Sequence, residues 1–188
     1  MSVDLLNRIS IKRGKAISVS LADNSMYPLK YYNCKNERDY KTDLKLLIGD
    51  LLYGSIHISS LNDNTASLIL AMDKVREYLK NTLGENDNIT FYWENGLFRS
   101  REEKEYIEIT NKAIEIFETE YFSKNEKGYY LVSGDRVLEK VSFNWQKGGI
   151  YRGKCNYFQE LKYHKSMSKK KAIVINQTFT DFQLYKLA

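Results

Sequence analysis

The sequence predicts an α+β fold: antiparallel β-hairpins with three main helices, followed by a small β-β-β-α-β module. Two observations support this prediction. Apolar residues recur at helical spacing in three long segments before residue 122, and they alternate with polar residues in the segments around them. After residue 128 the alternation returns, as is typical of paired strands. We therefore expect an α+β body over residues 1–122 and a basic, aromatic-rich module over residues 123–188.

The predicted body begins with a hairpin. Residues 6–22 alternate on both sides of Gly14, and glycine supplies the positive φ that a tight turn needs. Helical periodicity then predicts one helix over residues 36–53 and a second over residues 64–83. Residues 55–59 alternate like a short strand between these two helices.

The end of the body combines a hairpin signal with a helix start. Residues 89–93 are β-branched and aromatic, and Asn95-Gly96 is a strong hairpin turn. Ser100 and Glu103 then form a capping box, which predicts a third helix over residues 101–122.

The module is predicted from turns and alternation. Its expected elements are strands over residues 129–133, 136–145 and 150–158, a short helix capped by Ser166 or Ser168, and a last strand over residues 182–187. Such an order favours a small sheet with one helix packed on its face.

Composition places the chain among ordinary globular proteins. It has 188 residues, of which 43% are apolar and 28% are charged. Cys34 and Cys155 form no C-x-x-C pair, so we expect free thiols in a reducing cytoplasm. Asp4 and Arg8 interrupt the first residues, so we expect no signal peptide. No apolar run approaches the length of a membrane span, so we expect no membrane partner.

A glycine-rich stretch, Gly148 to Cys155, has the spacing of a phosphate-binding P-loop. A P-loop needs a helix that starts at its lysine, but Lys154 is followed by the strand-like residues Cys-Asn-Tyr-Phe. Cys155 also stands where serine or threonine would bind Mg²⁺. We therefore interpret the glycines as hairpin turns and expect no nucleotide at this stretch.

Positive charge is concentrated in the last third of the chain. Residues 121–188 carry 13 basic and 5 acidic residues, a balance of +8, against −3 for residues 1–120. Basic side chains neutralise phosphates, and aromatic faces stack on unpaired bases. We therefore predict a face that binds nucleic acid or another partner, made by Trp145, Lys147, Tyr151, Arg152, Lys154, Tyr157, Lys162, Lys165, Lys169, Lys170 and Lys171. A second interpretation stays open: the aromatic residues fill the core, and the lysines only face solvent.

Three consecutive lysines, Lys169, Lys170 and Lys171, stand at the start of the predicted module helix. Cations there oppose the helix dipole, and a bound anion would relieve that cost. We expect all three side chains to be solvated, so that their replacement leaves the fold intact.

The sequence shows no catalytic constellation. His57 and His164 have no H-x-x-H or H-x-E partner, and two cysteines alone cannot complete a zinc site. A pair formed by Cys155 and His164 has no supporting motif. We therefore predict a protein without catalytic residues, metal or cofactor. The alternative is a nuclease or other nucleic-acid-modifying enzyme whose acidic residues are brought together only by the fold.

Residues 8–16 (RISIKRGKA) and 23–31 (DNSMYPLKY) resemble uncharacterised small accessory proteins of phages and mobile elements of Gram-positive bacteria. The resemblance covers about the first 80 residues and implies a setting rather than a site. Proteins of this kind often inhibit host defence, anti-CRISPR proteins among them. The resemblance implies a cytoplasmic partner in the bacterial host, either a Cas effector-like ribonucleoprotein or nucleic acid.

Overall fold

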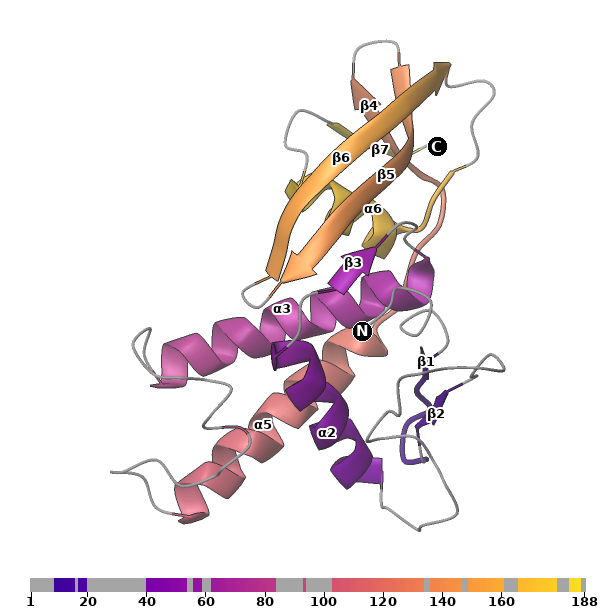
Figure 1. Cartoon of the computed structure of the whole chain (residues 1–188). Coiled ribbons are helices and arrows are strands. Elements are labelled where there is room, and N and C mark those ends of the chain that lie inside the picture. The colour runs from indigo at the N-terminus through magenta and orange to yellow at the C-terminus, as the bar shows by residue number, and fades with distance from the viewer. Residues whose placement is uncertain are drawn as a thin grey trace, which may run out of the picture.

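The computed structural model describes residues 9–15, 17–19, 40–53, 56–58, 62–83, 93, 103–133, 136–146, 149–160, 166–178 and 183–186. Its helices are α2 (Tyr40–Tyr53), α3 (Asp63–Leu83), α5 (Glu103–Tyr121) and α6 (Lys169–Thr178). Its strands are β1 (Ile9–Ser10), β2 (Ser18–Val19), β3 (Ile56–Ile58), β4 (Tyr129–Ser133), β5 (Arg136–Gln146), β6 (Gly149–Glu160) and β7 (Gln183–Lys186). Helices and antiparallel strands occur together, which confirms the α+β class (Figure 1).

Strand β5 is the centre of a five-stranded antiparallel sheet. Strand β6 pairs along one side of β5 over nearly its whole length. On the other side, β4 pairs with the start of β5 and β3 pairs with its end, while β7 pairs with β4. In the part of the chain that the structure describes, β6 has no second neighbour and therefore forms an edge of the sheet.

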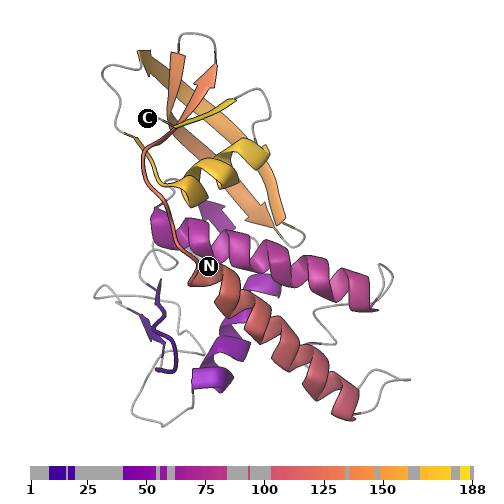
Figure 2. The same ribbon diagram turned by 180° about the vertical axis from the view of Figure 1, so that it is seen from behind.

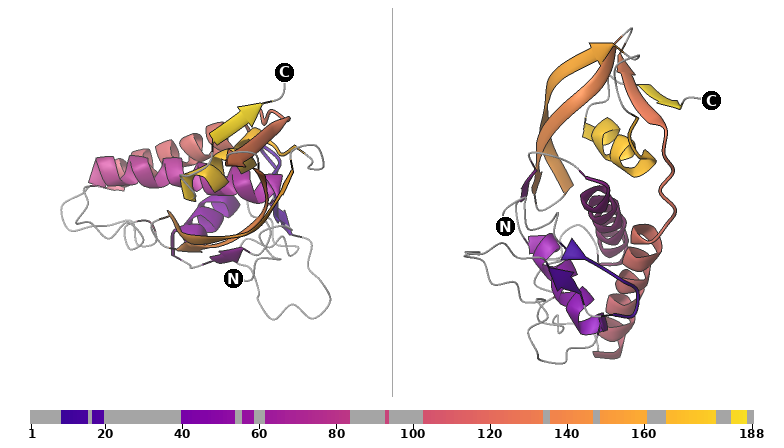
Figure 3. Two further views of the ribbon diagram at one scale, coloured as in Figure 1. Left: turned by 90° about the horizontal axis from the view of Figure 1, so that it is seen from above. Right: turned by 90° about the vertical axis from the view of Figure 1, so that its right-hand side faces the viewer.

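Helix α6 packs inside the curve of this sheet and also against α3 (Figure 3). Helix α3 in turn packs against α5 and α2, so it lies between the sheet layer and the other two helices (Figures 1 and 2). This position explains why residues 65–72 of α3 are all buried, because only a helix surrounded by other elements buries every face.

The hydrophobic core is one cluster that runs from Ile9 through α2, α3 and α5 to Ile175 of α6. It therefore includes residues from both predicted parts, 1–122 and 123–188. The short β1–β2 sheet joins the cluster through Ile9, Ile11 and Ile17. Gly14 lies in the connecting turn with φ of +74°, a conformation that favours glycine.

The predicted strand over residues 89–93 is wrong at Trp93, the one residue of that segment that the structure describes. Trp93 has a helical backbone and is 2% exposed. Its indole Nε1 donates a hydrogen bond to the backbone oxygen of Lys45 at 2.9 Å. Tertiary packing thus overrides the β preference of the aromatic residue. The predicted turn at Asn95-Gly96 and the capping Ser100 lie outside the described residues.

Candidate nucleic-acid interface and an interhelical pocket

Strands β5 and β6 form a long antiparallel ribbon, and it carries five of the predicted interface residues. Three register shifts interrupt the pairing. They leave one residue without an opposite partner at Glu139, Tyr151 and Asn156. Extra residues of this kind bend a strand and increase its twist, which accounts for the curved ribbon in Figure 3.

The predicted residues fall at neighbouring register positions. Arg152 pairs with Asn144, and Trp145 pairs with Ile150, so the extra residue Tyr151 lies between these two pairs. Two further predicted residues continue along β6: Lys154 opposite Ser142 and Tyr157 opposite Lys140. The predicted Lys147, Lys162 and Lys165 lie outside the described residues.

The position of Lys154 also bears on the glycine-rich stretch. Lys154 and Cys155 both lie inside β6, so a strand follows the lysine where a P-loop requires a helix. Gly149 and Gly153 also lie inside β6, paired with Gln146 and Phe143, so the prediction that they are turn residues is wrong, and Gly148 lies outside the described residues.

The expectation that all three lysines of α6 are solvated is wrong for Lys170, which is 5% exposed. Its Nζ donates hydrogen bonds to the backbone oxygens of Glu120 and Tyr121, at 3.1 and 3.0 Å, and lies 3.4 Å from Ser67 Oγ. Glu120 and Tyr121 are the last residues of α5, where the helix dipole is negative and favours a cation. Burial lowers the pKa of Lys170, and the Glu120 carboxylate partly opposes this effect.

The two neighbouring lysines have different surroundings. Lys169 and Lys171 are both half-buried. The Nζ of Lys169 lies 6.0 Å from the centre of the Tyr129 ring, within reach of a weak cation–π interaction. The backbone N–H of Lys171 donates to Ser168 Oγ at 3.3 Å, so Ser168 caps α6. Of the three lysines, Lys169 and Lys171 therefore remain candidates for contact with a partner.

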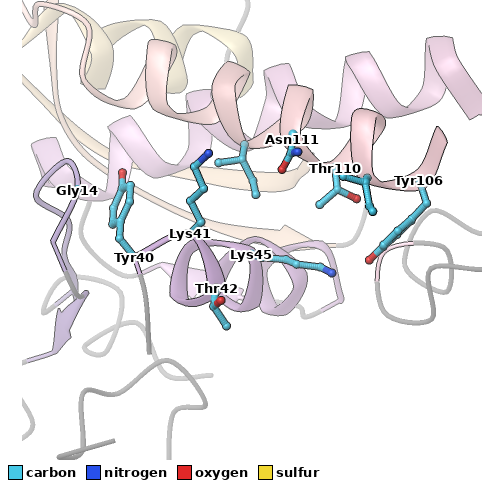
Figure 4. Close-up of a pocket in the computed structure, with 10 residues that line it drawn as sticks. Gly14, Tyr40, Lys41, Thr42, Lys45, Tyr106, Thr110 and Asn111 are labelled. Carbon is cyan, nitrogen blue, oxygen red and sulfur yellow. The ribbon is translucent and has the colours of Figure 1, made fainter. Parts of the chain in front are cut away.

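A pocket of about 520 Å³ lies between α2, α5 and the turn that joins β1 to β2 (Figure 4). The described part of its wall combines basic, hydroxyl and amide side chains with two tyrosines and two isoleucines, and contains no carboxylate. The lining residues are Gly14, Tyr40, Lys41, Thr42, Lys45, Tyr106, Ile107, Thr110, Asn111 and Ile114.

Tyr40 closes one end of the pocket. Its hydroxyl donates to the Glu118 carboxylate at 3.0 Å, and the same carboxylate lies 4.0 Å from Arg13 Nε. Burial, together with the hydrogen bond to Glu118, raises the pKa of Tyr40 above its ordinary value. The phenol therefore stays protonated, and the Glu118 charge is already held by two partners.

Tyr106 closes the other end. Lys45 Nζ lies 4.9 Å from the centre of its ring, and the Tyr106 hydroxyl donates to the backbone oxygen of Trp93 at 2.9 Å. Since Trp93 also donates to the backbone of Lys45, the three residues hold each other in place.

The sequence does not predict this pocket, because its wall comes from three separate segments. Tyr40 and Tyr106 belong to the apolar residues whose helical spacing predicts the helices over residues 36–53 and 101–122, so neither indicates a pocket. Lys41 and Lys45, four residues apart, are a signal that could have been noticed, because this spacing places two cations on one face of a helix. The sequence does not show that this face of α2 lies against α5.

The described residues contain no group of three or more His, Cys, Asp or Glu side chains that could hold a metal ion. No helix in those ranges is long and apolar enough to cross a membrane. Comparison of the chain with family models, curated proteins and solved structures finds no match.

Proposed function

We propose that this protein is a non-catalytic accessory protein of a phage or mobile element that inhibits host defence by binding nucleic acid, either free or within a ribonucleoprotein. The contact surface would be the β5–β6 ribbon together with Lys169 and Lys171. We name this set the ribbon face, with Tyr151, Arg152, Lys154 and Tyr157 as its strand residues. The module of residues 123–188 would thus carry the binding surface, inside the host cytoplasm.

The observation that supports this proposal best is the register of the ribbon. It places two basic and three aromatic residues at neighbouring positions of two paired strands, in a segment with a balance of +8. Arg152 and Lys154 are two residues apart on β6, so strand alternation places them on one side of the sheet, as contacts to successive phosphates require. The same alternation places Trp145, paired with Ile150, on the other side. The position of β6 at the edge of the sheet also supports the proposal, because a partner can approach β6 from the side that faces no described strand.

The proposal divides the work between two kinds of residue. Arg152 and Lys154 would neutralise phosphates, a contribution that is independent of sequence and weakened by salt. Tyr151 and Tyr157 would stack on unpaired bases, at about 1–3 kcal/mol per base. The expected ligand is therefore single-stranded nucleic acid rather than duplex.

The test is binding of labelled single-stranded RNA and DNA at several salt concentrations. We expect the double variant Arg152→Ala/Lys154→Ala to flatten the plot of log affinity against log salt by about 1.4, which is two contacts at about 0.7 each on a single strand. The control is Lys74→Ala/Lys80→Ala, which removes the same charge from exposed positions on α3. Equal loss in both variants would mean that net charge alone drives binding and would contradict the proposal.

The length of the labelled strands after incubation with the protein distinguishes this proposal from the enzymatic alternative. Shortened products that depend on Mg²⁺ and disappear on chelation would show a nuclease. Capture of a host protein from lysate that survives nuclease treatment, with no affinity for either nucleic acid, would show an acidic protein partner instead.

A further inference from the structure

The interhelical pocket is lined by cationic and hydrogen-bonding groups of one electrostatic sign. Lys41 and Lys45 line it directly, and the turn at Gly14 carries three more basic residues, Lys12, Arg13 and Lys15. Two carboxylates lie near these residues: Glu118, which is bound to Tyr40 and paired with Arg13, and the buried Asp43 in the first turn of α2. Neither is among the described residues that line the pocket, and an excess of lining cations favours an anionic ligand.

The first turn of α2 contributes to the same field. Tyr40, Lys41 and Thr42 are the first three residues of this 14-residue helix, and all three line the pocket. The N-terminus of a helix carries a partial positive charge and favours phosphate or carboxylate groups. In Figure 4, Lys41 extends from α2 toward α5, so its ammonium group lies across the space between the two helices.

Thr110 of α5 lines the same pocket. It is 5% exposed, and its hydroxyl oxygen is buried without a hydrogen-bond partner. A buried hydroxyl left in this state costs free energy, and native proteins seldom retain one. Figure 4 shows that Thr110 projects from α5 toward α2. This oxygen is buried, so it does not face the pocket in the present rotamer. Rotation about Cα–Cβ can turn it toward the pocket, where a ligand would bind it, or toward a carbonyl oxygen of its own helix.

The size and the remaining wall define the class of ligand. A volume of about 520 Å³ is in the range of pockets for small molecules rather than for single ions. Ile107, Ile114 and the Tyr106 ring add apolar surface beside the polar groups. The ligand is therefore expected to combine an anionic group with an organic body.

We propose that this pocket binds a small phosphorylated molecule of about nucleotide size. Its phosphate would lie at the start of α2 and be held by Lys41, Lys45 and the hydroxyl of Thr110, while its organic part would lie against Tyr106 and Ile107. This site is separate from the ribbon face, and its existence does not depend on the proposed function.

The test measures binding of AMP, inorganic phosphate and adenosine to the full chain by calorimetry and by amide chemical shifts. We expect AMP to bind, inorganic phosphate to compete with it and adenosine to bind at least tenfold more weakly. Lys41→Ala should weaken AMP binding about tenfold. Lys112→Ala, an exposed lysine of α5 outside the pocket wall, should leave it unchanged. A 5′-phosphorylated oligonucleotide distinguishes a free phosphorylated molecule from the end of a nucleic-acid strand.

Thr110→Val provides a test in which the effects on stability and on binding have opposite signs. Valine has the same shape without the hydroxyl, so we expect the free protein to unfold at the same or a higher temperature while AMP affinity falls severalfold. The proposal is overturned if adenosine binds as well as AMP, if the Lys41 and Thr110 variants keep full affinity, or if millimolar AMP leaves the amide shifts of α2 and α5 unchanged. Arg152→Ala/Lys154→Ala should retain AMP binding, so failure of the ribbon face is distinguishable from failure of this site.

Discussion

Replacement of Lys170 tests the most unexpected contact in the fold. The change Lys170→Ala removes the donor that two backbone oxygens at the end of α5 share. The Glu120 oxygen keeps a second donor, Ser123 Oγ, at 2.6 Å, but the Tyr121 oxygen loses its bond to Nζ. An unpaired buried carbonyl costs about 1–3 kcal/mol. The variant also loses the packing of the buried lysine stem. Together, the two effects should lower the free energy of unfolding by about 2–4 kcal/mol.

Urea denaturation followed by circular dichroism measures this loss directly. For a chain of this length, the melting temperature should fall by about 2–4 °C for each kcal/mol. Lys170→Met keeps most of the stem and should cost about 1–2 kcal/mol, which separates the missing donor from the missing packing. Lys171→Ala, the adjacent half-buried lysine, should change stability by less than about 0.5 kcal/mol. If Lys170→Ala and Lys171→Ala proved equally mild, the bridge from α6 to the end of α5 would be refuted.

Three further predictions concern the core. Burial raises the pKa of Asp73 from 3.8 to about 6, so the folded chain binds this proton more tightly than the unfolded chain does. Stability should therefore fall by about 1–3 kcal/mol as the pH rises through this window, and Asp73→Asn should remove that part of the slope in urea titrations. Gly49→Ala should destabilise the protein by about 1–2 kcal/mol, because the new Cβ would lie 3.1 Å from the indole ring of Trp93. The fluorescence of Trp93 should shift as well. Unchanged stability would show that Trp93 can move. Residues 123–188 expressed alone should give a poorly dispersed amide spectrum, because Ala172, Val174 and Ile175 pack into the shared core; a well-dispersed spectrum would show an independent domain.

Much of the element order could be predicted because periodicity depends on local sequence. The α3 boundaries differ from the prediction by one residue at one end, and the predicted helix over 101–122 corresponds to α5, Glu103–Tyr121. Ser168, one of two proposed caps, does cap α6. The failures have tertiary causes. Nothing local shows that Trp93 adopts a helical turn over Gly49, or that the middle one of three identical lysines points into the core.

The candidate sites divide in the same way. Register positions along β5 and β6 follow from alternation and turn signals, so the sequence could nominate a ribbon of basic and aromatic residues. It could not place the register shifts at Glu139, Tyr151 and Asn156, because these depend on how the ribbon bends over α6. The interhelical pocket depends wholly on packing, since 49 residues of chain, 54–102, separate α2 from α5.

The position of α3 determines where this protein has surface available for binding. Residues 65–72 are buried on every side, so this half of the helix offers no face to a ligand. Among the described residues, both binding sites that we propose therefore lie on elements that surround α3: the β5–β6 ribbon on one side, and α2 with α5 on the other. Lys170 connects the two sides, because it starts on α6, under the ribbon, and ends on the last turn of α5, the helix that carries Thr110. The charge of this buried lysine is satisfied by the carbonyl end of α5, so it holds α6 and α5 on one core, whereas the half-buried Lys169 and Lys171 on either side of it keep part of their surface in solvent.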